Sequence, residues 1–259
     1  MAVFSSAPSS ASAACPVTPG VFATSWIGGS GHYNTDANWT NGAPSGSCDA
    51  SITAAGTYTV VMTGGSVAKS MTIGGAGSSP TLQISAEGPN TNLNVAAGGQ
   101  LSIASGAAII LKCNVTPSSC GAPNIGAPTI TNAGTITVAA DVNADAGSTS
   151  FISGPLLNTG TMQFNHKAKF NNGAVTNQGT VNIADGITVA SGGSHCGDAS
   201  VSFKNDAGGT LNAAGTGTFD VINYEQGAGP TAGVNPVQIP CGSLKYTGNG
   251  ASKVRAYGG

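Results

Sequence analysis

The sequence predicts an all-β chain folded as a right-handed parallel β-helix (solenoid) with few or no helices. The first observation is a repeat in which Asn-x-Gly-Thr precedes an apolar–polar–apolar triplet. The second is that apolar residues alternate as in half-buried strands, while no segment keeps a helical period. The repeats are ITNAGTITVA (130–139), LLNTGTMQFN (156–165), VTNQGTVNIADG (175–186) and FKNDAGGTLNAA (203–214), the last with two extra residues before the threonine.

The spacing of the repeats indicates a stack of coils. The aligned residues Asn132, Asn158, Asn177 and Asn205 follow one another at steps of 26, 19 and 28 residues. Fixed repeats with periods of about 20 to 50 residues are typical of solenoids and propellers. The unequal steps indicate insertions between equivalent coils.

Each repeat supplies a corner between two short strands. Gly134, Gly160 and Gly179 are expected to adopt a positive φ, which asparagine also tolerates, and the following threonine starts a strand. If successive coils are in register, the four aligned asparagines stack and hydrogen-bond to one another. This stacking satisfies corner amides that water cannot reach.

The first half of the chain contains similar strand-like runs between glycines and small residues. A chain of this size gives on the order of ten coils, and at about 4.8 Å per coil the rod is roughly 50 Å long. The chain therefore divides into a small-residue leader (1–24), β-helix repeats with an aromatic N-terminal cap (25–225) and a C-terminal strand and loop segment (226–259). The strand-like runs are 56–62, 70–75, 81–85, 92–99, 100–106 and 108–112.

Composition excludes several classes of protein. Charged residues make up only 7% of the 259 residues, the net charge is −2, and there are 40 glycines. No basic patch favours nucleic acid, and no apolar run reaches the roughly 18 residues that membrane insertion requires. The regular spacing of Val, Ile, Leu and Phe argues against disorder. The beginning of the chain lacks the charged and apolar regions of a signal peptide.

The cysteines indicate an oxidising compartment. Six cysteines allow 15 connectivities, but residues far apart in the sequence of an elongated stack are usually far apart in space. Neighbouring cysteines are therefore expected to pair, and reduced buried thiols in a cytosolic protein remain the alternative. The expected pairs are Cys15–Cys48, Cys113–Cys120 and Cys196–Cys241.

The segment SWIGGSGHYNTDANWTNGAP (25–44) carries a resemblance. It resembles the W-x-G-G-x-G-x-W-x-x-x-x-N-W opening found ahead of the repeats in bacterial secreted and autotransporter-type β-helical surface proteins, with Tyr33 in place of the middle tryptophan. The segment LNVAAGGQLSIASGAAI and the N-x-G-T repeats resemble the same passenger regions. The resemblance implies a β-helix over roughly residues 25–225, but such rods serve as adhesins, stalks, binding modules and enzymes alike.

Catalytic and metal-binding patterns are weak. Asn34-Thr35-Asp36 matches the N-T-D of polygalacturonase-like glycosidases, but the paired Asp, the Gly-His-Gly and the Arg-x-Lys of those enzymes are missing, so a corner role is favoured. A lyase needs a basic residue beside acidic calcium ligands, and the single Arg255 lies five residues from the end. In His195-Cys196-Gly197-Asp198, a disulfide role for the cysteine is favoured over a nucleophile or a metal site. No cofactor and no metal site are expected.

Two groups of residues are candidates for glycan contact. Exposed faces of Trp26, Tyr33 and Trp39 could stack on sugar rings, although a cap over the open core of the solenoid is the favoured role. Lys167 and Lys169 lie on one side of a strand and could contact an acidic glycan, and a solvated strand face is the alternative.

These patterns predict an extracellular or cell-surface protein with a structural or adhesive role. Self-association into a fibre or surface assembly is expected, or association with other surface proteins, and the leader could supply a strand to a neighbouring copy. The alternative is a carbohydrate-binding module. A polysaccharide lyase or glycosidase is less favoured because no catalytic constellation is found.

Overall fold

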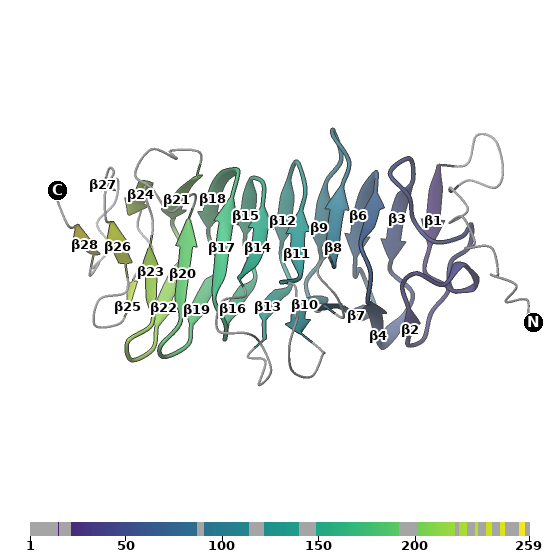
Figure 1. Ribbon diagram of the computed structural model, residues 1–259, viewed down its shortest axis with the longest axis horizontal. Coiled ribbons are helices and arrows are strands. Elements are labelled where there is room, and N and C mark those ends of the chain that lie inside the picture. Colours follow the sequence, from purple (N-terminus) through teal and green to yellow (C-terminus); the bar gives the residue numbers. More distant parts are fainter. Residues whose placement is uncertain are drawn as a thin grey trace, which may run out of the picture.

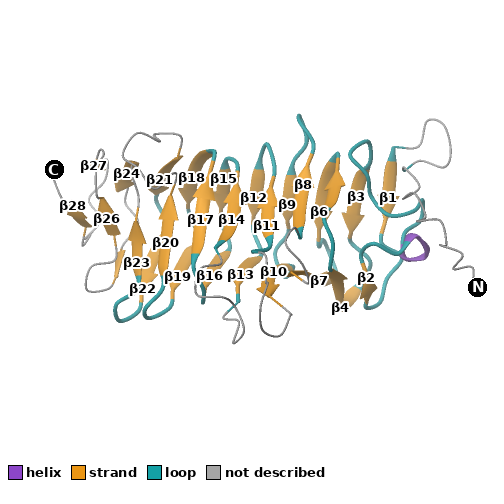
Figure 2. Ribbon diagram, viewed as in Figure 1, coloured by secondary structure: helices purple, strands orange, loops and turns teal. Residues whose placement is uncertain are grey.

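Three parallel β-sheets run the length of the molecule and enclose one core (Figure 1). The structure, a computed structural model, describes residue 15 and residues 22–86, 91–113, 122–139, 149–191, 201–220, 223–226, 231–232, 237–239, 244–246 and 254–256. Within these residues the single helical element is one 3₁₀ turn, η1 (Asp36–Asn38), beside β2 (Figure 2). The predicted parallel β-helix is confirmed.

Within the described residues, each coil between the first and the last contributes one strand to each sheet in turn, so strands three apart in chain order are neighbours except at the two ends, where some neighbours are two apart. Sheet 1 contains ten strands, in agreement with the predicted ten coils. Its strands, in spatial order, are β1 (Ala23–Ser25), β3 (Asp49–Ile52), β6 (Ser70–Ile73), β9 (Leu101–Ile103), β12 (Ile130–Asn132), β15 (Leu156–Asn158), β18 (Gly173–Asn177), β21 (Val201–Asn205), β24 (Asn223–Gln226) and β27 (Leu244–Tyr246).

The other two sheets have nine strands each. Sheet 2 contains β2 (Gly31–His32), β4 (Gly56–Met62), β7 (Ser78–Ala86), β10 (Ala108–Cys113), β13 (Thr135–Val138), β16 (Thr161–Phe164), β19 (Thr180–Ile183), β22 (Thr210–Ala213) and β25 (Thr231–Ala232). Sheet 3 contains β5 (Ser66–Ala68), β8 (Asn92–Val95), β11 (Asn124–Gly126), β14 (Ser150–Ser153), β17 (Ala168–Asn171), β20 (Thr188–Ser191), β23 (Thr218–Asp220), β26 (Val237–Ile239) and β28 (Val254–Ala256).

The coils extend beyond the boundaries expected from the sequence. Strand β1 already pairs with β3 from Ala23 onward, within the segment expected to be leader. After residue 225, β27 continues sheet 1 and β28 continues sheet 3. The C-terminal strands therefore belong to the same stack, because each one pairs in parallel with the coil before it.

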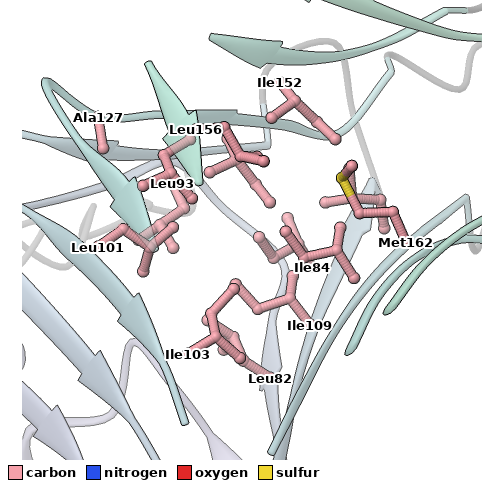
Figure 3. Close-up of a cluster of buried hydrophobic side chains, with 14 of the residues drawn as sticks. Leu82, Ile84, Leu93, Leu101, Ile103, Ile109, Ala127, Ile152, Leu156 and Met162 are labelled. Atoms are coloured by element: carbon pink, nitrogen blue, oxygen red, sulfur yellow. The ribbon is translucent and has the colours of Figure 1, made fainter. Parts of the chain in front are cut away.

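Alternating side chains from all three sheets fill the interior. In β13, β16 and β19 the second and fourth residues are buried, as the apolar–polar–apolar triplets predict. Figure 3 shows part of this core, where Leu82 and Ile84 from β7 point toward Leu93 of β8 and Leu101 of β9. Burial of this continuous column is the main source of stability for a chain with so few charges.

The core of the later coils is aromatic. The Phe203 and Phe219 rings meet edge to face at 4.5 Å between centroids, and Phe170 packs edge to face on Phe164 at 5.8 Å. Tyr224 stacks on Phe203 at 6.0 Å. Inward-facing positions in this half of the rod are thus filled by rings from all three sheets.

The corners between sheets 1 and 2 contain a column of buried asparagines. Asn132, Asn158, Asn177 and Asn205 each end a strand of sheet 1 and are fully buried. The Nδ2 of each of the first three donates to the Oδ1 of the next, at 2.7, 2.7 and 2.8 Å. The same Nδ2 atoms also donate to a threonine carbonyl of the following coil, at 3.1, 3.4 and 3.2 Å. The structure therefore contains the asparagine stack that the repeats predict.

The glycines of these corners serve a purpose different from the expected one. Gly134, Gly160 and Gly179 are not among the glycines with a positive φ, so that expectation is wrong. A Cβ on Gly160 would collide with the carbonyl oxygen of Gly134, and a Cβ on Gly179 would collide with that of Gly160. Glycine is required there because the backbones of successive coils approach too closely for any side chain.

Candidate functional site

A shallow groove crosses the outer face of sheet 3 over β8, β11, β14 and β17. Its volume is about 260 Å³. Most of its lining is uncharged and polar, and one aromatic residue takes part. The lining residues are Asn92, Asn94, Asn124, Ile125, Gly126, Phe151, Ser153 and Asn171.

Strand alternation and one glycine create the groove. Leu93, Ile125 and Ile152 point into the core, so their neighbours on the same strands point outward. Gly126 lies between Asn94 and Ser153 in the sheet register. Because it lacks a side chain, the floor is lower at this coil; a Cβ there would lie 3.1 Å from Asn94 Oδ1 and 4.0 Å from Ser153 Cβ.

Hydrogen bonds fix the orientation of the Asn124 side chain, whereas, among the described residues, other polar side chains of the groove are unpaired. Asn124 Nδ2 donates to Asn92 Oδ1 at 2.8 Å, and Asn124 Oδ1 accepts from the backbone N–H of Phe151 at 2.8 Å. The Asn94, Ser153 and Asn171 side chains have no hydrogen-bond partner within the described part of the chain. The groove therefore offers unpaired donors and acceptors beside a fixed amide.

Phe151 is an outward-facing aromatic in this wall. The ring is partly exposed, and its register neighbours are Asn124 on one side and Lys169 on the other. Lys169 faces outward from β17, as does the exposed Lys167 just before that strand, because Ala168 between them is buried. Contact of the two lysines with an acidic glycan stays a prediction.

The aromatic residues near the N-terminal end are buried. Trp26, Tyr33 and Trp39 are at most 4% exposed, and the Trp39 ring meets Trp26 and Tyr33 edge to face at 5.2 and 5.1 Å. Trp39 Nε1 donates to the Tyr33 carbonyl at 2.7 Å, and Trp26 Nε1 donates to the Gly29 carbonyl at 2.9 Å. The interpretation of these rings as an exposed sugar platform is wrong, because they pack against the first coils as part of the core.

A second cavity, of about 430 Å³, lies beside this aromatic cluster, and Asn34 and Asp36 of the Asn-Thr-Asp segment line its wall. Asp36 starts the 3₁₀ turn, and its Oδ1 accepts from the Ala43 N–H at 2.9 Å, which supports the corner role. Burial raises the pKa of the Tyr33 phenol, and interaction with Ser66 lowers it to a smaller extent. Asp36 is the single carboxylate among the described lining residues, so no acid–base pair faces this cavity.

The structure joins Cys15 to Cys48, with 5.9 Å between their Cα atoms. This bond ties Cys15 to the residue just before β3. Cys113 ends β10, but its side chain and the residues Cys120, Cys196 and Cys241 lie outside the described part of the chain. The pairs Cys113–Cys120 and Cys196–Cys241 stay predictions, and the segment from His195 to Asp198 likewise lies outside.

The carboxylates whose pKa departs from its usual value lie singly on the surface of the rod. The Ser70 hydroxyl, assisted by Lys69, holds the pKa of Asp49 below its usual value. Lys204 lies 3.5 Å from both Asp206 and Glu225. In the described residues, no group of three or more His, Cys, Asp or Glu could hold a metal ion, and no helix is long and apolar enough to cross a membrane.

Comparison of the chain with protein-family models, curated proteins and solved structures finds no match. The candidate site therefore depends on geometry alone. Sequence reasoning identified Lys169 but missed the groove residues. A signal was present in the triplets 92–94, 124–126 and 151–153, where a buried aliphatic residue stands between two outward-facing positions on each of three successive coils.

Proposed function

We propose that this chain is an extracellular structural and adhesive rod, similar in role to the β-helical regions of bacterial secreted and autotransporter-type surface proteins. In this proposal it associates with further copies of itself or with other surface proteins. The observation that carries the proposal is the continuous stack of coils with a hydrogen-bonded asparagine column at its corner. A column of paired buried amides fixes the register of the coils, and a fixed register favours a stiff spacer.

The ends of the stack support the self-association part of the proposal. Among the described residues, β27 and β28 stand at the ends of sheets 1 and 3, and a strand at the end of a sheet presents one backbone edge for pairing. The Cys15–Cys48 disulfide supports the extracellular part, because such bonds persist in oxidising compartments.

Light scattering over a range of protein concentrations tests this proposal. The mean mass of the full chain is expected to rise with concentration. Val254→Pro removes one backbone donor from the edge strand β28 and should lower the association, whereas Val254→Leu keeps the donor and serves as the control. A wild-type protein that remains monomeric at millimolar concentration would contradict self-association.

A further inference from the structure

We propose that the groove on sheet 3 binds a glycan strand that carries carboxylates and lies along the rod axis. This inference rests on the adhesive part of the proposed function and names a ligand class for it. It concerns Asn94, Gly126, Phe151, Ser153 and Lys169, which share one outer face of four neighbouring coils.

The dimensions of the groove fit an extended ligand. Asn94, Gly126, Ser153 and Asn171 are in register on β8, β11, β14 and β17. Neighbouring strands lie about 4.8 Å apart, so these four positions span about 14 Å along the axis. A row of equivalent positions at a constant step suits a polymer with a regular repeat.

The available polar groups suit sugar hydroxyls. Each carboxamide offers a donor and an acceptor side by side, and hydroxyls can both donate and accept. Asn94, Ser153 and Asn171 have no partner among the described residues, while Asn124 is held by Asn92 and by the Phe151 backbone. A hydroxyl-rich ligand can therefore replace water at these groups without breaking hydrogen bonds of the protein.

Phe151 supplies the apolar contact. Binding sites for small ligands and glycans combine aromatic surface with a few placed polar groups. The phenylalanines at 164, 170, 203 and 219 are buried in the core, whereas Phe151 turns its partly exposed ring to the groove. The ring can cover the C–H face of a sugar while the neighbouring amides bind its hydroxyls.

A peptide or a nucleic acid fits this groove less well. Strands β11 and β14 are paired on both sides, so no backbone edge is open for strand addition by a peptide. Nucleic-acid binding requires many cationic side chains along the site. Beside Phe151, the charged register neighbour is Lys169. One ammonium group beside Phe151 suits a carboxylate on an otherwise hydroxylated chain.

Calorimetric titration of the full chain with two matched probes tests the inference. The acidic probe is hexagalacturonate, and the neutral probe is its fully methyl-esterified form. Wild type is expected to bind both, the acidic form more tightly. Lys169→Gln should lower the affinity for the acidic probe roughly threefold, because an exposed ion pair contributes little. The affinity for the neutral probe should not change. Phe151→Ala should lower the affinity for both probes about tenfold.

Gly126→Leu is the decisive variant, because it fills the floor of the groove. The backbone of Gly126 does not have a positive φ, and the nearest atom to an added Cβ belongs to the side chain of Asn94, so the fold is expected to accept it. Loss of binding to both probes is expected. Ala174→Leu introduces the same side chain at an exposed position of β18 in sheet 1 and should change nothing. Circular dichroism melting verifies that each variant is folded.

Two results would overturn the inference. One is a wild-type chain that binds neither probe nor hexamannuronate, a second acidic probe, at millimolar concentration. The other is a Gly126→Leu variant that binds as wild type does. Neither result bears on self-association, which is measured by light scattering on the chain alone.

Discussion

Asn158 shows how one side chain fixes the register of three coils. Its Oδ1 accepts from Asn132 and its Nδ2 donates to Asn177, both at 2.7 Å. Asn132 stands at the start of the column, in register with Ile103 of the preceding coil, and its Oδ1 has no partner. On the three strands of sheet 1 before Asn132, this register position is occupied by Ile52, Ile73 and Ile103. The asparagine column therefore begins where a column of isoleucines ends, and one buried oxygen is left unpaired.

This arrangement predicts unequal effects of the same substitution. Asn158→Ile leaves an N–H of Asn132 and the Oδ1 of Asn177 unpaired in the core. Asn132→Ile removes the existing unpaired oxygen and creates one at Asn158, so the number stays constant. Urea unfolding should show Asn158→Ile less stable than Asn132→Ile by about 2 to 6 kcal/mol, because two more buried groups are left unpaired and each costs about 1 to 3 kcal/mol. Equal stabilities would mean that the amides are not paired as described.

Gly179 shows a second residue-scale effect, in which close approach of backbones requires glycine. Gly179→Ala places a methyl group on the Gly160 carbonyl, and the backbone of the neighbouring coil cannot move away easily. Gly98 has φ +80° and open space around it, so Gly98→Ala costs only the strain of about 1 kcal/mol. Thermal melting should show Gly179→Ala as the more destabilised variant. A larger loss for Gly98→Ala would contradict the close-approach explanation for the corner glycines.

At the scale of elements, strand β23 carries a carboxylate with a raised pKa. Asp220 faces outward beside the buried Phe219, and partial burial raises its pKa. The folded state thus binds the proton more tightly than the unfolded state, so this contribution to stability is present at low pH and is lost as pH rises through the folded pKa.

Asp220→Asn should therefore raise the melting temperature at neutral pH. The gain should disappear near pH 3, below the ordinary aspartate pKa of about 3.9, because both side chains are then neutral. Melting curves of wild type and variant across this range test the sign. A variant that is less stable than wild type at neutral pH would show that the carboxylate forms a favourable interaction.

The elements also show which features the sequence can predict. The N-x-G-T repeats predict β12–β13, β15–β16 and β18–β19, because corner residues and alternation agree at each position. The reason for the corner glycines was not predictable, since backbone contact between coils depends on the distance at which they pack. The groove was missed because Gly126 forms its floor only beside Asn94 and Ser153, and that register follows from the number of residues in each coil.

At the scale of the whole molecule, the disulfide connects Cys15 to the coil that begins with β3. The bond closes a loop with a sequence separation of 33 residues. The chain-entropy estimate for a loop of this size is about 3 to 4 kcal/mol. Cys48→Ser should lower the unfolding free energy by about that amount in denaturant titrations, and Ser47→Ala, next to it, should have a small effect. A free thiol at Cys48 in protein from its native source would contradict the oxidising compartment.

We propose that the chain acts as a stiff extracellular rod that associates through its ends. Cryo-electron microscopy of the protein as it occurs on its native surface tests this most directly. The expected image shows thin rods with a repeat of about 4.8 Å along the axis, joined end to end or to neighbouring surface proteins. Isolated single rods in the cytosol, without contact to one another or to a surface, would contradict the claim.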